Sequence, residues 1–439
     1  MYTHKDLREY ARRRRALIKQ LPPKSVLIIA TGHEKIRNRD AEYRFRPASD
    51  FYYLCGFAEA DAVLVIRKDK TPHTVLFSLP KNTLAETWTG RRVGQTEARS
   101  VYGVDEAYSL DDMNLQMPTL LENQQRIYYP MGEEPDFDQQ VQAWIKKVKQ
   151  KYRSGVNAPT EIHSHENLLH NMRLIKSPWE IQRMRVAAKV SAQAHQEAMR
   201  SCKPGQWEYQ IEAGFDHVFR KNNCHHAYNS IVASGDNANI LHYTENNSQL
   251  QAKDLLLIDA GAEFDNYAAD ITRTFPVSGK FSNEQKLLYQ LVLDAQQAAI
   301  NQIKPGKPWN LPHDAAVKVL TKGLVKLGIL KGNIRKLIKE EKYKQFYMHN
   351  TGHWLGMDVH DVGAYKVNGQ WRKFLPGMVL TVEPGIYIAA NTKGVAKKWC
   401  GIGIRIEDDV LVNKSSCEIL TSDVVKEISD IEALMAEAI

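Results

Sequence analysis

Apolar and polar positions in the first 172 residues follow two different periods. Residues 1–20 alternate charged and apolar side chains with helical spacing, which predicts an amphipathic helix. Four short apolar runs are typical of strands: Ser25 to Ala30, Phe51 to Leu54, Ala62 to Ile66 and Thr74 to Phe77. Strands interleaved with helices predict an α/β domain over residues 1–172.

The pattern changes near residue 173, where a second domain, residues 173–439, is expected to begin. Ser177-Pro178-Trp179-Glu180 has the composition of a capping box, and helical spacing follows until Lys203-Pro204-Gly205. A second copy of this pattern begins at Ser282 and ends at Lys304-Pro305-Gly306. The two copies are offset by about one hundred residues, which indicates duplicated half-domains with a ligand site between them.

Two aspartates mark a strand, turn and strand in the second domain. The apolar run Leu255 to Ile258 ends on Asp259, and the chain resumes as a strand from Asp270. A hairpin would bring both carboxylates together, where they repel each other and lose hydration. A metal ion would relieve that cost. The alternative is that Asp259 caps a turn while Asp270 pairs with Arg273.

Three further stretches place polar residues where strands or tight turns are expected. Residues 349–361 contain three histidines, Glu383 precedes Pro384-Gly385 at the end of an apolar run, and residues 403–409 alternate so that Arg405 and Glu407 share one face. Each stretch alone could be structural. Two aspartates, one histidine and two glutamates together form an oxygen-rich set that can hold two divalent cations, with Mn²⁺, Co²⁺, Fe²⁺ or catalytic Zn²⁺ as candidates.

These stretches resemble the metal-site motifs of the pita-bread metallopeptidases, the family of methionine aminopeptidases, prolidases, creatinases and Xaa-Pro aminopeptidases. The resemblance covers nearly the whole chain, including residues 38–57 and 86–92, and is nearest to the bacterial aminopeptidase P branch. It implies an α/β N-terminal domain followed by an α+β pita-bread domain, in which duplicated halves surround a curved antiparallel sheet.

The resemblance also implies a role for each matched residue. Asp259 would chelate one metal ion, Asp270 and Glu407 would bridge both ions, and His353 with Glu383 would complete the other; manganese is the family's usual metal. The residues expected to act on the substrate or support the site are His242, His349, His360, Arg405, Tyr387 and Trp88, and Glu383 is also a candidate proton shuttle. Asn350 departs from the family pattern, which more often has a smaller residue there.

The implied reaction is hydrolysis of the first peptide bond of peptides with proline at the second position, through a hydroxide that bridges two divalent metal ions. The resemblance further implies a homodimer or homotetramer. A prolidase, which takes dipeptides only, is the nearest alternative, and a catalytically inert pita-bread module that binds peptides is another. Creatinase chemistry is disfavoured, because that branch works without this metal set. Residues 86–92 fit a loop that contacts a ligand, although a buried Trp88 fits equally well.

Composition narrows the other possibilities. The 439 residues are 43% hydrophobic and 25% charged, with net charge +8, but basic and acidic residues are interspersed, so nucleic-acid binding is not indicated. Arg12 to Arg15 fit a solvated helix face better than a transit peptide. The absence of a signal-like segment and of a membrane-length apolar run predicts a cytoplasmic protein without membrane association. The five cysteines include no C-x-x-C pair, so neither a disulfide framework nor a thiolate zinc site is expected.

Overall fold

The computed structural model describes residues 4–437 of the chain. Two compact units divide it, Met1–Met172 and Arg173–Ile439. Among the described residues, every helix is too short or too polar to span a lipid bilayer.

The first unit is an α/β domain with one sheet. Its helices are α1 (His4–Gln20), α2 (Ser49–Cys55), α3 (Thr83–Thr89), α4 (Gly94–Tyr102), α5 (Met113–Leu121) and α6 (Pro135–Lys149), and α7 (Glu166–Leu174) crosses the boundary between units. Its strands are β1 (Ser25–Ala30), β2 (Ile36–Asn38), β3 (Ala41–Glu42), β4 (Val63–Lys68), β5 (His73–Ser78), β6 (Glu106–Ser109), β7 (Arg126–Tyr128) and β8 (Glu161–His163). The six-stranded sheet has the order β6-β5-β4-β1-β7-β8, and the two-residue and three-residue strands β3 and β2 pair separately.

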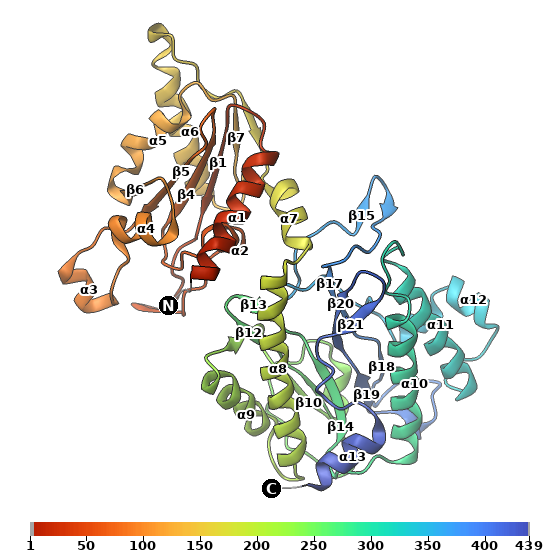
Figure 1. Cartoon of the computed structure of the whole chain (residues 1–439). Coiled ribbons are helices and arrows are strands. Elements are labelled where there is room, and N and C mark those ends of the chain that lie inside the picture. The colour runs from red at the N-terminus through yellow and green to blue at the C-terminus, as the bar shows by residue number, and fades with distance from the viewer. Residues whose placement is uncertain (1–3, 438–439) are drawn as a thin grey trace. The chain divides into compact units, whose positions relative to one another are not determined.

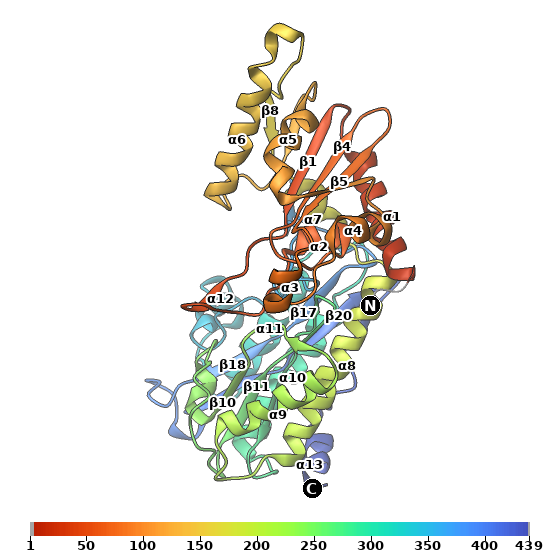
Figure 2. The same ribbon diagram turned by 90° about the vertical axis from the view of Figure 1, so that its left-hand side faces the viewer.

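Helices cover both faces of this sheet. Figures 1 and 2 show α5 and α6 on one face and α1 on the other. Trp144 and Met117 pack with Val26 and Ile28 in one apolar cluster, which joins α5 and α6 to β1. The predicted α/β domain is therefore confirmed.

Two local predictions in this unit are wrong. Phe51 to Leu54 belong to helix α2 rather than to a strand, and all four side chains are buried. A short apolar run has no polar face, so its periodicity cannot distinguish a buried helix from a buried strand. The loop expected over residues 86–92 is helical up to Thr89, because the side chain of Asn82 accepts a hydrogen bond from Ala85 N (3.0 Å) and caps α3.

The second unit has the α+β composition expected from the resemblance. Its helices are α8 (Pro178–Ser201), α9 (Glu208–Lys221), α10 (Asn283–Ile300), α11 (Leu311–Lys326), α12 (Ile334–Lys339) and α13 (Ile428–Ala436). Its strands are β9 (His225–His226), β10 (Ile231–Ser234), β11 (Leu255–Asp259), β12 (Ala262–Phe264), β13 (Tyr267–Ala268), β14 (Thr272–Pro276), β15 (Lys366–Val367), β16 (Gln370–Trp371), β17 (Val379–Val382), β18 (Gly385–Ile388), β19 (Ile402–Arg405), β20 (Asp408–Val412) and β21 (Cys417–Ile419). In Figure 1 the helices α8 and α9 flank these strands on one side and α10 and α11 on the other.

The two halves of this unit repeat the same turn after their first long helix. The backbone N–H of Gly205 donates to Leu250 O (2.9 Å) and that of Gly306 to Phe374 O (2.9 Å). Both glycines have positive φ, +90° and +82°, which few side chains tolerate. Isolated bridges then follow at equivalent places, Trp207 with Gln249 and Pro308 with Lys373. The Lys-Pro-Gly repeat thus marks a true structural duplication.

The helix starts predicted at Ser177 and Ser282 are capping boxes. Each serine side chain accepts from the backbone N–H three residues later, and the side chains of Glu180 and Gln285 accept from the serine N–H groups. Behind these helices one apolar cluster joins residues of both halves, from Ile258 on β11 to Ile404 on β19. A shared core fixes the two halves against each other, so strand ends from both can meet at one site.

Candidate metal centre

The two aspartates come together because β11 and β14 are antiparallel neighbours. Asp259 lies opposite Thr272 in the register, and β12 and β13 form the excursion between the strands. The phenol oxygen of Tyr228 lies 2.7 Å from Oδ1 of Asp259 and 2.5 Å from Oδ1 of Asp270. One hydroxyl therefore contacts both carboxylates. The alternative pairing of Asp270 with Arg273 is wrong, since Arg273 donates to Oδ1 of Asp408 (2.7 Å).

Glu407 reaches the same place from the other half. It lies at the break between β19 and β20, where its backbone N–H donates to Thr272 O (3.0 Å). The hydroxyl of Thr272 donates to Oε2 of Glu407 (2.7 Å), which orients the carboxylate toward the aspartates. A contact between the halves therefore completes the carboxylate cluster.

His353 and Glu383 close the cluster from the β17 side. Glu383 is the first residue after β17, and the backbone N–H of His353 donates to Oγ1 of Thr381 (3.0 Å). Nδ1 of the His353 ring lies 3.0 Å from Trp354 O, which leaves Nε2 on the side of the carboxylates. That atom lies 3.4 Å from Oδ2 of Asp270 and 3.6 Å from Oε1 of Glu383.

This arrangement fits divalent cations. The ligand atoms of Asp270, His353 and Glu407 all lie within 4.8 Å of one another, and these residues line a cavity of about 460 Å³ together with Asp259 and Glu383. Burial, and then the charge of Asp270, raise the pKa of Glu407 well above its usual range. Burial works against a charged His353, yet its hydrogen bond to Asp270 raises its pKa to about 9. The carboxylates are therefore crowded enough to hold protons without a metal ion, and divalent cations would relieve their mutual repulsion.

The histidines expected to act on the substrate lie on the same wall. His242, His349 and His360 all line the cavity with the five candidate ligands. Burial lowers the pKa of His349 to about 3, and burial followed by the charge of His353 lowers that of His360. Both rings are therefore neutral near pH 7. The rings of His353 and His360 meet edge to face, with centroids 4.4 Å apart.

Arg405 and Tyr387 support this wall from behind. Arg405 donates from Nη2 to Oδ2 of Asp259 (2.6 Å) and from Nη1 to the hydroxyl of Tyr387 (3.2 Å). The Tyr387 hydroxyl is in turn 2.9 Å from Nε2 of His349. Tyr387 on β18 is 3% exposed, with its hydroxyl held between Arg405 and His349, and its expected role in lining the pocket stays a prediction.

Trp88 belongs to the first unit, where it lies on α3 with 83% of its side chain exposed. The possibility of a buried Trp88 is therefore wrong, and its role in substrate binding stays a prediction. Asn350, the one departure from the family pattern, lines the metal cavity.

Sequence reasoning missed Tyr228, which touches both aspartates. Burial, and then the charge of Asp259, raise the pKa of this phenol well above its usual range, so it stays protonated and can donate to a carboxylate. Asp409 was also missed; it accepts from the backbone N–H of Asp270 (3.1 Å). Neither residue stands in a spacing that indicates a site. Asp409 follows Glu407 and Asp408 on the chain and is hard to single out among them.

Comparison with known proteins places the chain in a family. Residues 182–414 match metallopeptidase family M24, and residues 10–128 match the aminopeptidase P N-terminal domain. The chain is 43% identical to the Xaa-Pro aminopeptidase of Escherichia coli, over 98% of each chain, and 44% identical to that of Haemophilus influenzae, over 97% of each.

Solved structures agree over the whole chain. The aminopeptidase PepP of Pseudomonas aeruginosa superposes with a TM-score of 0.97 at 51% identity, covering 98% of each chain. A zinc-substituted E. coli aminopeptidase P in complex with product gives a TM-score of 0.96 at 43% identity, covering 99% of each chain. The protein belongs to metallopeptidase family M24, and both the resemblance and the pita-bread fold predicted from sequence are confirmed.

Proposed function

We propose that the protein is a metal-dependent aminopeptidase that hydrolyses the N-terminal Xaa-Pro bond of peptides. The observation that carries this proposal is the convergence of Asp259, Asp270, His353, Glu383 and Glu407 with three histidines on one cavity. The relatives of matching length that bear the name Xaa-Pro aminopeptidase support the choice of substrate.

The five ligand residues would hold two divalent ions, and we propose Mn²⁺ because carboxylate oxygens dominate the set. When bound, such ions make a water molecule nucleophilic at neutral pH and polarise the scissile carbonyl. Arg405 and Tyr228 then act as positioning residues, since each fixes a carboxylate through a hydrogen bond of 2.7 Å or less. Ligands held in one orientation bind metal ions more tightly than mobile ones.

The chain's own groups account for the remaining steps. Glu383 lies on the cavity wall between His349 and His353, where its carboxylate can take the proton of the attacking water and pass it to the leaving proline nitrogen. His242 and His360 lie beside the ligand set and can donate to the oxygen that becomes negative in the transition state. His349, held by Tyr387, keeps that wall rigid.

The proposal is tested with the purified protein loaded with Mn²⁺ and a matched set of peptides. We expect hydrolysis of Xaa-Pro-Ala at the first bond and much slower hydrolysis of Xaa-Ala-Ala. Asp270→Asn, which removes a carboxylate shared by the cluster, should lose both bound metal and activity. Equal rates on the two tripeptides would rule out proline selection.

The same assay separates the two alternatives from sequence. Hydrolysis of Xaa-Pro dipeptides with no action on tripeptides would indicate a prolidase. Full metal content without hydrolysis of either peptide would indicate an inert peptide-binding module. The relatives of matching length do not favour a prolidase.

We further propose a homodimer or homotetramer in the cytoplasm. Leu84 and Trp88 lie one turn apart on α3 with 73% and 83% of their side chains exposed, an apolar surface that a second copy would cover. Five free cysteines suit a reducing compartment. Light scattering coupled to gel filtration should give a mass of two or four chains, and Leu84→Ser with Trp88→Ser should lower it. A monomeric mass for the unchanged protein would contradict the proposal.

A further inference from the structure

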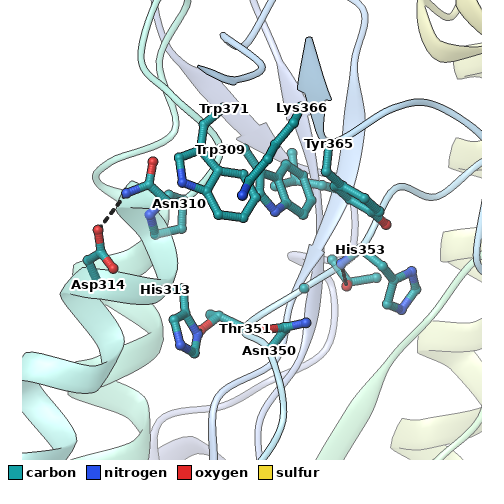
Figure 3. Close-up of a pocket in the computed structure, with 14 residues that line it drawn as sticks. Trp309, Asn310, His313, Asp314, Asn350, Thr351, His353, Tyr365, Lys366 and Trp371 are labelled. Carbon is teal, nitrogen blue, oxygen red and sulfur yellow. Dashed lines mark hydrogen bonds between the residues drawn. The ribbon is translucent and has the colours of Figure 1, made fainter. Parts of the chain in front are cut away.

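A second and larger cavity of about 610 Å³ adjoins the metal site. We call it the aromatic pocket and define it by Trp309, His313, Asn350, Tyr365, Lys366 and Trp371, which all line it (Figure 3). Asn350, Gly352 and His353 line both this pocket and the metal cavity. The two cavities are therefore neighbours that share this short segment of their lining.

Aromatic rings form the upper wall of the pocket in Figure 3. The ring of Trp309 lies 4.1 Å from that of the buried Trp354 and 4.7 Å from that of Tyr365, between ring centroids. This packing holds Trp309 in place. Trp371 on β16 is 41% exposed, and the Nζ of Lys366 lies 4.3 Å from its ring centre. The wall thus combines a fixed inner indole with an accessible outer one.

The opposite wall is polar and tied to the metal-site segment. Nδ1 of His313 lies 2.9 Å from Oγ1 of Thr351, which lies 2.6 Å from the Tyr347 hydroxyl. The carbonyl of Thr351 accepts from the backbone N–H of Glu383 (2.8 Å). Burial lowers the pKa of His313, so this wall carries a neutral imidazole. Asp314 also lines the pocket, and its Oδ2 accepts a hydrogen bond from Nδ2 of Asn310 (2.7 Å).

Gly352 belongs to the segment that both cavities share. A Cβ atom at this position would lie 2.0 Å from the carbonyl oxygen of Thr381, so the backbone approaches β17 as closely as glycine permits. Asn350, two residues earlier, lines both cavities. A peptide whose scissile bond is at the metal centre must continue past proline, and the aromatic pocket is the adjoining space of sufficient size.

We propose that the aromatic pocket receives the third residue of the peptide and favours an aromatic side chain there. This inference rests on the proposed function, since it assigns the substrate segment that follows proline. An aromatic ring would stack against Trp371 and Trp309, and ring pairs of this kind prefer offset or edge contacts at the spacings these walls offer. A glycine at the third position would leave the pocket to water.

The test compares Xaa-Pro-Trp with Xaa-Pro-Gly in the Mn²⁺-loaded enzyme. We expect kcat/KM to favour Xaa-Pro-Trp by about tenfold, chiefly through KM, which is the usual effect of burying one ring. Trp371→Ala should reduce this ratio severalfold and Trp371→Phe should largely restore it. Trp207→Ala is the matched control, because Trp207 is 39% exposed in the same unit and lines neither cavity.

The outcomes are distinct from those of the proposed function. If Xaa-Pro-Gly is hydrolysed but the ratio is near one, or if Trp371→Ala leaves the ratio unchanged, the pocket assignment is overturned while the activity stands. Calorimetry on metal-loaded Glu383→Gln gives a reading that needs no turnover: Xaa-Pro-Trp should bind about tenfold more tightly than Xaa-Pro-Gly. Equal affinities there would overturn the inference even if turnover fails.

Discussion

The guanidinium of Arg405 donates from Nη2 to Oδ2 of Asp259 over 2.6 Å, although both residues belong to a site that binds cations. Its Nε also donates to Oγ1 of Thr272 (3.0 Å), and the side chain is 5% exposed. The fixed fork of arginine makes these contacts in one orientation, so Asp259 has a single position for coordination. The positive charge of Arg405 does not prevent a cation from binding, because the four carboxylates of the site outnumber this single arginine.

Arg405→Lys should therefore weaken metal binding despite keeping the charge. Lysine cannot span Asp259, Thr272 and Tyr387 at once, so Asp259 becomes mobile. We expect metal affinity to fall about tenfold to hundredfold, the usual effect of losing a residue that orients a ligand. A chelator competition titration with elemental analysis measures it. Arg335→Lys, on an exposed position of α12, is the control, and equal affinity in both variants would contradict the positioning role.

A buried ion pair holds the segment that carries His360. Nζ of Lys176 lies 2.8 Å from Oδ2 of Asp361, and each side chain is 1% exposed; Arg173 donates to Oδ1 (2.6 Å). Burial works to raise the pKa of Asp361, but the charges and hydrogen bonds of Lys176 and Arg173 together outweigh it, and the pKa is lowered. Asp361 is thus ionised at neutral pH and ties residues 358–361 to the start of the second unit.

Asp361→Asn should destabilise the protein by about 3–5 kcal/mol, because it leaves the buried Lys176 without its counter-charge. Urea denaturation followed by circular dichroism measures the change. Turnover should also fall, since His360 is the neighbouring residue. Asp294→Asn, exposed on α10, should change the free energy of unfolding by less than about 0.5 kcal/mol. A stable, fully active Asp361→Asn protein would show that the segment is held elsewhere.

The buried ring of His195 on α8 makes the free energy of unfolding depend on pH. The ring is completely buried, Nε2 lies 3.0 Å from Ala260 O, and Nδ1 has no hydrogen-bond partner. Burial lowers the pKa of His195 to about 3. The unfolded chain takes up a proton below its ordinary pKa of about 6.5 while the folded chain does not, so this group costs stability as pH falls from about 6.5 toward 3.

Unfolding free energies measured between pH 7.5 and 5 should show this slope. His195 accounts for about 1.4 kcal/mol per pH unit at the lower end. His195→Gln should be less stable at pH 7.5 and should lose less stability on acidification. His217→Gln removes an exposed imidazole of α9 and should keep the slope of the unchanged protein. Parallel slopes for all three proteins would rule out His195 as the source.

Much of the site could be predicted because its residues interrupt regular patterns. Asp259 and Glu383 stand where apolar strands end, and a charge at such a place requires compensation. The capped helices and the Lys-Pro-Gly turns could be predicted because a few neighbouring residues determine their conformation. The prediction of the fold class was confirmed for the same reason, because it rests on short segments whose own chemistry fixes their conformation.

What could not be predicted depends on contacts between distant segments. Tyr228 touches Asp259 and Asp270 across 31 and 42 residues of chain, and no spacing encodes that approach. Only the folded structure shows that the hydroxyl of Tyr387 contacts both Arg405 and His349, which lie 18 and 38 residues away on the chain. Helix α2 was missed because its side chains are buried all round. In each case tertiary packing, rather than local pattern, determines the outcome.

The histidines of the cavity fall into two groups by their distance from the carboxylates. His353 places Nε2 within 3.4 Å of Asp270 and 3.6 Å of Glu383, whereas His242 and His360 line the cavity beside the five ligands. His353→Ala should therefore lose bound metal. The alanine variants of His242 and His360 should retain it, because the five proposed ligands do not include them.

Those two variants should instead lose turnover. Removing one donor to the developing oxyanion lowers kcat by about a hundredfold or more, while KM changes less when the interaction exists mainly in the transition state. Elemental analysis and steady-state kinetics on the same preparations make the comparison. His225→Ala is a control for loss of an imidazole, since His225 on β9 lies outside the cavity lining and should leave both readings unchanged. If His242→Ala or His360→Ala loses a metal ion in proportion to its activity, that histidine is a ligand, and the set of five must be enlarged.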